Sequence, residues 1–137
     1  MIVYADSSAL LKRAVDEAES DALDDALETY VADGASLVSS SLAWVEVGRA
    51  LRRAAADQGF EVDSNELLAG ALSGVAERPM TLDVISLARR LDPPMLRTLD
   101  AIHVATAVLV AADVVVAYDE RLMGACSQNG LSTSSPQ

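Results

Sequence analysis

The sequence predicts an α/β protein, a three-layer α/β/α sandwich whose central parallel sheet has four to five strands. Short runs of β-branched residues alternate along the chain with segments whose apolar residues recur every three or four positions. Strands that alternate with helices imply right-handed crossovers and a parallel sheet covered on both faces. The 137 residues, 51% of them hydrophobic, suffice for a single domain over residues 1–137.

The first half of the chain contains two strand-like runs, each followed by a helix. Residues 1–5 form the first run, which ends at Asp6, and one of the two serines after Asp6 can cap the next helix. A second helix is expected over about residues 19–32, before the second strand at residues 36–39. Ser41 is the candidate N-cap of the helix that follows. The apolar face of that helix is formed by Trp44, Val47, Leu51 and Ala55. Its opposite face carries Glu46, Arg49 and Arg53.

The second half predicts one dominant strand and one buried helix. Residues 114–117 form the clearest strand, and the helix over residues 99–111, with Thr98 as its cap, is apolar nearly all round. Pro93 and Pro94 force the chain out of helix before it. The remaining expected elements are helices at 64–77, 83–90 and from 120 to about 129, a brief strand at 79–82, and an edge strand within 131–135.

Composition limits the class of protein. The net charge of -11 and pI near 4.3 argue against binding of nucleic acid by bulk electrostatics, although a nuclease whose acids hold a metal ion is still allowed. The single Cys126 excludes an internal disulfide and a thiolate metal cluster. The only long apolar stretch, residues 101–112, is too short to span a bilayer. We therefore expect a cytoplasmic protein without membrane association.

Four acidic residues can be placed at one edge of the predicted sheet. Asp6 and Asp119 come directly after strand-like runs, Glu46 lies about one turn into the helix after the second strand, and Asp100 lies in the first turn of the buried helix. The carboxyl ends of parallel strands share one edge, where ligands bind. Asp113 precedes its strand and must lie at the opposite edge. The four acids therefore form the candidate site.

Convergence of these acids points to a divalent metal. Two carboxylates 4 Å apart repel by about 4 kcal/mol at an effective dielectric of 20. A cation bound between them makes the electrostatic energy of the group favourable. Oxygen ligands without histidine or cysteine clusters select Mg²⁺ or Mn²⁺. Considered one at a time, the acids also have structural explanations. Each aspartate can stabilise a helix N-terminus, and Glu46 can form an ion pair with Arg49. Asp83 is a weaker candidate, because it makes sense as a first-turn acid after the cap Thr81.

Two neighbouring residues are candidates for supporting the acids. Ser7 can orient Asp6 as well as cap its helix. His103 lies one turn after Asp100 and either faces the site or is a hydrogen-bonded core histidine.

Four motifs occur in a fixed order: Asp6-Ser-Ser-Ala-Leu, Ser40-Ser-Leu-Ala-Trp-Val-Glu46, Leu99-Asp-Ala-Ile-His-Val-Ala-Thr-Ala107 and Tyr118-Asp-Glu-Arg-Leu122. With them the chain resembles PIN-domain ribonucleases over nearly its full length, and more narrowly the VapC-type toxin of a VapBC toxin-antitoxin pair. The resemblance implies an Mg²⁺- or Mn²⁺-dependent endoribonuclease that cuts tRNA or ribosomal RNA and inhibits translation. It also implies a VapB-type antitoxin partner and a homodimer.

The four acids match the family's four acids in order, with one departure. A threonine or serine often stands two residues before the fourth acid, and this chain has Ala117 there. The resemblance makes all four acids catalytic residues and metal ligands. We expect Asp6 and Asp100 to provide the principal metal contacts. Candidates for positioning RNA phosphates are Arg13, Arg49, Arg53, Arg97 and Arg121. The alternative function is a catalytically silent PIN-fold module that only binds protein.

Overall fold

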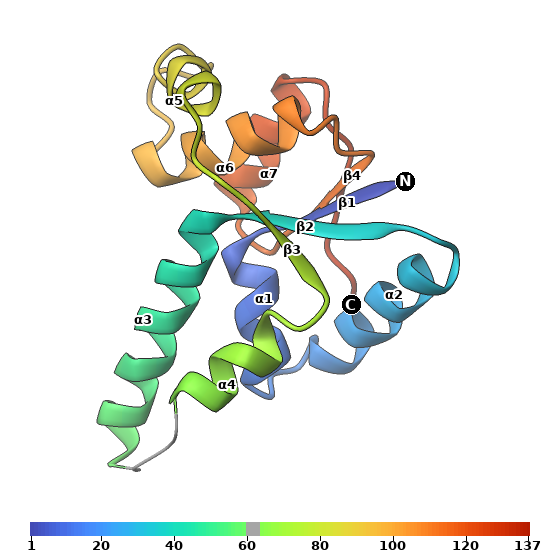
Figure 1. The fold of residues 1–137 in the computed structure, drawn as a ribbon, viewed down its shortest axis with the longest axis vertical. Helices are drawn as coiled ribbons and strands as arrows, with labels where there is room; N and C mark the ends of the chain where they lie inside the picture. The colour runs from blue at the N-terminus through green and yellow to red at the C-terminus, as the bar shows by residue number, and fades with distance from the viewer. Residues whose placement is uncertain (60–63) are drawn as a thin grey trace.

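The computed structural model describes residues 1–59 and 64–137, and its centre is a parallel sheet. The strand order is β3-β2-β1-β4-β5, with every neighbouring pair parallel (Figure 1). Tyr4 of β1 is aligned with Val38 of β2 and with Val115 of β4. The strands are β1 Ile2–Ala5, β2 Ser36–Ser40, β3 Val75–Arg78, β4 Val114–Val116 and β5 Thr133–Ser134. The expected α/β architecture is therefore confirmed.

Helices cover both faces of this sheet, with α5, α6 and α7 on one side and α1 to α4 on the other (Figure 1). Side chains alternate between the faces along β1. Tyr4 packs with Val104 of α6 and Leu122 of α7, whereas Val3 packs with Leu23 of α2. The helices are α1 Ser7–Ala14, α2 Ser20–Ala32, α3 Ser41–Gln58, α4 Ser64–Ala71, α5 Leu82–Ala88, α6 Thr98–Leu109 and α7 Glu120–Gln128.

The prediction for the third strand was wrong in position. The strand is Val75–Arg78, which the sequence had assigned to the end of a helix, and the helix ends at Ala71. Gly74 adopts a φ of 75°, which ends the helical path and favours glycine. Val75 then aligns with Leu37 of β2. The strand is mostly exposed at the sheet edge, so it lacks the alternating apolar pattern that identifies a strand in sequence.

Three helix caps also differ from the sequence prediction by one residue. Asp6 caps α1 with its own carboxylate, Ser40 caps α3 with its hydroxyl, and Arg97 is the cap residue of α6 without a side-chain bond. Helix α6 is the buried central helix expected from its composition, with six of its residues buried. Among the described residues, no helix is long and apolar enough to cross a membrane.

Candidate active site

Asp6 stands where β1 ends and α1 begins, and only 4% of it is exposed. Its Oδ1 accepts hydrogen bonds from the backbone amides of Ser8 (2.8 Å) and Ala9 (3.2 Å) and from the Ser8 hydroxyl (2.5 Å). Within the described part of the chain, Oδ2 has no hydrogen-bond partner. Burial raises the pKa of Asp6, although the hydrogen bonds from Ser8 and Ala9 oppose this. One carboxylate oxygen is therefore anchored and the other is free for a ligand.

Glu46 projects from the second turn of α3 and is held by two side chains. Its Oε1 accepts a hydrogen bond from the Ser7 hydroxyl at 2.7 Å and lies 2.6 Å from Nε2 of His103. Burial raises the pKa of Glu46, but the hydrogen bonds from His103 and Ser7 outweigh that effect, so the pKa lies below its usual value. Glu46 is therefore ionised at neutral pH and fixed in direction.

A buried network determines the tautomer of His103. The backbone N–H of Ser40 donates to the Tyr4 hydroxyl at 3.2 Å, and that hydroxyl lies 2.6 Å from Nδ1 of His103. In the neutral ring only one nitrogen carries a proton, and the ionised Glu46 carboxylate can only accept, so Nδ1 is the acceptor and the Tyr4 hydroxyl donates to it. The neutral ring then carries its proton on Nε2, which donates to Glu46. Tyr4 and His103 are 0% and 2% exposed, so water does not compete for these bonds.

Asp100 and Asp119 are joined by Arg97. The guanidinium donates from Nε to Oδ2 of Asp100 and from Nη2 to Oδ2 of Asp119, both at 3.0 Å. Asp119 also caps α7, because its Oδ1 accepts from the amides of Arg121 and Leu122. Asp119 is thus anchored without a hydroxyl from position 117, where Ala117 is fully buried in the core.

The four acids line a single cavity of about 330 Å³. Asp6 enters it from the end of β1, Glu46 from α3, Asp100 from α6 and Asp119 from the residue before α7. The same cavity is lined by Ser7, Ser8, Arg97, Thr98, Leu99 and His103. The structure therefore brings together the acids that sequence topology selected, and both candidate supporting residues lie with them.

Other candidates lie elsewhere. Arg13 donates to the backbone carbonyls of Ala71 and Ser73, in a different cavity. Arg121 lines a cavity that also includes Arg97, next to the acids. Asp83 is exposed in the first turn of α5, and Asp113 accepts a hydrogen bond from the Ile2 amide at the opposite edge of the sheet. Arg49 and Arg53 lie farther along α3, in a concavity with Arg52.

Sequence reasoning missed two residues of the site. Ser8 donates to Asp6 and accepts a hydrogen bond from the Tyr118 amide at 2.9 Å, so it links the ends of β1 and β4. Tyr4 fixes His103 from within β1. For Tyr4 a signal existed: strand alternation places its polar hydroxyl on the same face as the buried α6 helix, where it needs a partner.

The donor set fits a hard cation, although the side chains would have to adjust to hold one. Carboxylate oxygens from four separate elements, including the unpartnered Oδ2 of Asp6, are the chemistry that Mg²⁺ and Mn²⁺ require. In residues 1–59 and 64–137, no three acidic, histidine or cysteine side chains already stand in metal-binding positions. The guanidinium of Arg97 instead forms ion pairs with both Asp100 and Asp119.

Comparison with known proteins assigns this arrangement to a family, because the profile of the PIN domain matches residues 3–125. The chain belongs to the PIN-domain family. It is 34% identical over 137 residues to "Ribonuclease VapC47" of Mycobacterium tuberculosis (strain CDC 1551 / Oshkosh), covering 98% of this chain and 97% of that protein. It is 38% identical over 138 residues to "Ribonuclease VapC46" of strain ATCC 25618 / H37Rv, with the same coverage of both chains.

Solved PIN-domain structures share the fold. VapBC2 from Rickettsia felis, bound to a DNA fragment from its promoter, superposes with a TM-score of 0.77 at 12% identity and full coverage of both chains. VapC20 of Mycobacterium tuberculosis, described as a sarcin-ricin loop cleaving toxin, gives 0.69 at 17% identity, covering 98% of this chain and 99% of that one. The resemblance to VapC-type PIN domains is thus confirmed, and with it the prediction of a nuclease, a hydrolytic enzyme.

Proposed function

We propose that this PIN-domain protein is an Mg²⁺- or Mn²⁺-dependent endoribonuclease that hydrolyses phosphodiester bonds of tRNA or ribosomal RNA. It acts as the toxin of a toxin-antitoxin pair in the cytoplasm, inhibits translation, and is neutralised by a VapB-type antitoxin. The observation that carries the proposal is the convergence of Asp6, Glu46, Asp100 and Asp119 on one cavity. The relatives named as VapC ribonucleases and the solved VapBC complex support the same assignment.

The metal would be held by the four acids, with Asp6 and Asp100 as principal contacts and Glu46 and Asp119 completing the ring. When bound, such an ion lowers the pKa of its water, polarises the phosphate and stabilises the leaving oxygen. The carboxylates themselves repel a phosphate, so they contribute only by holding the ion. Asp6 is suited to this because its anchored Oδ1 leaves Oδ2 facing the cavity.

Around the acids, other side chains orient Glu46 or are candidates for contacts with RNA phosphates. Ser7 and His103 both donate to Oε1 of Glu46 and so restrict its rotation. Arg97, whose side chain is 57% exposed, can release the acids and contact the RNA phosphate when a metal takes its place. Arg121 in the neighbouring cavity is placed for a similar contact. Arg49 and Arg53 are candidates for a phosphate farther along the RNA, whereas Arg13 is held by backbone carbonyls.

Partner proteins are supported by large apolar side chains that are exposed at the surface, one of which lines the acid cavity. Leu82 is 83% exposed, Met95 is 90% exposed, and Leu99, which lines the acid cavity, is 47% exposed. Exposed large apolar side chains favour a protein interface when a partner covers them. A VapB-type antitoxin or the second subunit of a homodimer would cover them. Light scattering of the free protein and of the co-expressed pair tests both partners.

The decisive experiment is RNA cleavage by the purified protein. Incubation with tRNA and ribosomal RNA should give defined fragments with Mg²⁺ or Mn²⁺ and none with EDTA. Asp6→Asn and Asp100→Asn should each lower the rate on the order of 100-fold or more, because each removes a ligand charge. Asp83→Asn is the matched control for Asp100, since both are first-turn acids but Asp83 lies outside the cavity. Cleavage that survives EDTA and both active-site substitutions would refute the proposal.

A further inference from the structure

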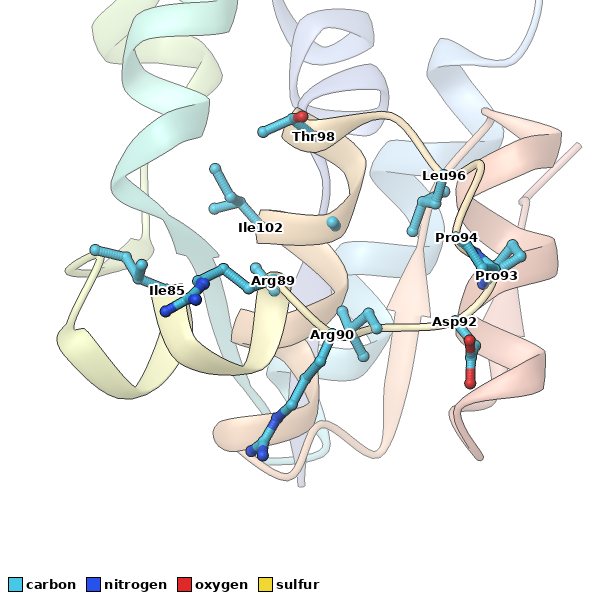
Figure 2. A pocket seen from close by; sticks show the side chains of 12 residues that line it. Ile85, Arg89, Arg90, Asp92, Pro93, Pro94, Leu96, Thr98 and Ile102 are labelled. Carbon is cyan, nitrogen blue, oxygen red and sulfur yellow. The ribbon is translucent and has the colours of Figure 1, made fainter.

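A second cavity, of about 490 Å³, lies beside the acid cavity, between α5, the chain that follows it and α6. We name it the α5–α6 cavity (Figure 2). Its volume is within the range of small-molecule sites. The polar residues at its edge include Arg89, Arg90, Asp92 and Thr98. Its apolar lining is formed by Ile85, Ala88, Leu91, Leu96, Ala101 and Ile102.

Thr98 connects the two cavities, because it lines both. The sequence predicted this threonine as the cap of α6, but the cap residue is Arg97, and no side-chain cap bond forms. Within the described residues, the Thr98 hydroxyl has no hydrogen-bond partner and is available to a ligand. The two cavities therefore have a common lining residue at the start of α6.

The charge at this cavity favours a phosphate. Arg89 has no acid within ion-pair distance in the described part of the chain, unlike Lys12 and Arg97, which are paired with carboxylates. Figure 2 shows the Arg89 side chain extending toward Ile85 of the preceding helix turn, while Arg90 extends away from Thr98 and Ile102. The carboxylate of Asp92, the acid of this lining, also points away from Thr98 and Ile102.

We propose that the α5–α6 cavity binds one unpaired nucleotide of the RNA substrate, adjacent to the scissile phosphate at the acids. Its base packs on the apolar lining, the Thr98 hydroxyl meets a polar edge or the ribose, and Arg89 binds the flanking phosphate. This inference rests on the proposed function, because the acid cavity defines where the strand enters. The acid cavity has a volume of about 330 Å³. When it holds a phosphate and its cation, the neighbouring nucleotide must lie outside it.

Binding can be tested without catalysis. Backbone amide signals of the ¹⁵N-labelled protein in EDTA would be followed while AMP, GMP, CMP and UMP are added separately to millimolar concentration. At least one nucleotide should shift the signals of residues 85–102, and ribose 5-phosphate should shift them less, because it has no base. Shifts confined to the α3 arginines, or no shifts at all, would overturn the proposal. This titration remains informative even if the protein cleaves no RNA.

Filling the cavity tests its role in cleavage. Ala88→Phe places a ring in the cavity, and Ala56→Phe is the matched control on the exposed side of α3. Ala88→Phe should raise KM for RNA about tenfold with little change in kcat, since one base loses its binding surface. Hydrolysis of bis(4-nitrophenyl) phosphate, which needs only the acid centre, should stay unchanged in both variants. Loss of both activities in folded Ala88→Phe would mean that the acid centre was disturbed, which contradicts a separate subsite.

A charge-matched pair tests the phosphate contact. Arg89→Ala and Arg90→Ala remove the same charge from adjacent positions, but Arg89 extends toward the lining residue Ile85, whereas Arg90 extends away from Thr98 and Ile102. Arg89→Ala should reduce the slope of log KM against log salt by about 0.7, the value for one phosphate contact on a single strand. Arg90→Ala should leave most of that slope intact.

If Ala88→Phe instead abolishes neutralisation by a co-expressed antitoxin while RNA cleavage is unchanged, the cavity binds protein and the proposal fails.

Discussion

Arg97 and Asp119 are joined by a hydrogen bond of 3.0 Å from Nη2 to Oδ2, although they are 22 positions apart in the sequence. The same guanidinium binds Asp100 through Nε. Two of the four site acids therefore share one cation of the protein itself, and the hydrogen bond to Asp100 in turn raises the pKa of Arg97. Since the Arg97 side chain is 57% exposed, water can replace these contacts when the side chain leaves.

Arg97→Ala should therefore bind Mn²⁺ more tightly than the wild type, because the ion no longer competes with a guanidinium for Asp100 and Asp119. The affinity for Mn²⁺ should rise at most about fivefold, because an exposed ion pair contributes little free energy. Isothermal titration calorimetry in low salt measures it. Arg121→Ala serves as the control, since its side chain is exposed and only its backbone amide binds Asp119. An unchanged affinity in Arg97→Ala would show that the metal does not use these two acids.

Metal addition should also stabilise the folded protein. A ligand present at 100 times its dissociation constant stabilises the native state by about 2.7 kcal/mol. We expect Mn²⁺ to raise the Tm of the wild type and to have a smaller effect on Asp119→Asn. Asp113→Asn is the control that tests topology, because Asp113 is close in sequence but lies at the opposite edge of the sheet, bound to the Ile2 amide. Equal Tm shifts in the two variants would contradict a metal site at Asp119.

Asp6 should show a conflict between stability and activity. Its carboxylate is buried, and burial raises its pKa, so the charged form destabilises the fold. Asparagine keeps an oxygen that can accept the cap hydrogen bonds from Ser8 and Ala9 but carries no charge. We therefore expect Asp6→Asn to raise the Tm while activity is lost. Asp6→Ala should melt about 3 °C below Asp6→Asn, since a lost cap costs about 1 kcal/mol.

The stabilisation by Asp6→Asn should depend on pH in a defined direction. A carboxyl with a raised pKa binds its proton more tightly in the folded than in the unfolded state, so the wild type gains relative stability at low pH. The Tm difference between variant and wild type should vanish below the unfolded pKa of about 3.9 and grow as pH rises through the higher folded pKa. Melting in metal-free buffers from pH 3.5 to 8 measures this. A difference that grows toward low pH would contradict the assignment.

The acids could be placed from sequence because strand order and chain direction determine which residues share the carboxyl edge of the sheet. Asp6 and Asp119 follow strands whose apolar, β-branched runs are unambiguous, and Asp113 was excluded on the same reasoning. Strand β3 could not be placed in this way. Val75 to Arg78 is an exposed edge strand, so burial leaves no alternation in its sequence.

The side-chain pairings could not be predicted from the sequence, because they depend on tertiary contacts. The pairing of Arg97 with Asp119 joins the segment before α6 to the cap of α7, and the pairing of Tyr4 with His103 spans 99 positions. Arg97 appeared only as a candidate for RNA contact, and the alternative pairing of Glu46 with Arg49 does not occur among the described ion pairs. Helix periodicity identifies neighbours on one helix, whereas these contacts join separate elements.

Tyr4 and His103 should matter through Glu46, which they orient. Tyr4→Phe removes the proton donated to Nδ1 and leaves the Ser40 amide without its acceptor, a loss of about 1–3 kcal/mol in stability. With Nδ1 free, the imidazole can change tautomer and present an unprotonated Nε2 to Glu46. We expect kcat to fall on the order of tenfold with little change in KM, as for partners that orient metal ligands.

His103→Gln separates orientation from packing, because the glutamine amide can still donate to Glu46, whereas His103→Ala leaves a cavity and no donor. The glutamine variant should retain more kcat than the alanine variant at equal fractions folded. In the wild type, ¹⁵N chemical shifts of the imidazole should report a proton on Nε2, and Tyr4→Phe should shift them toward a mixture of tautomers. If Nδ1 carries the proton in the wild type, Tyr4 does not donate to His103. Glu46 must then be oriented by Ser7 alone, and Ser7→Ala should lower kcat more than Tyr4→Phe does.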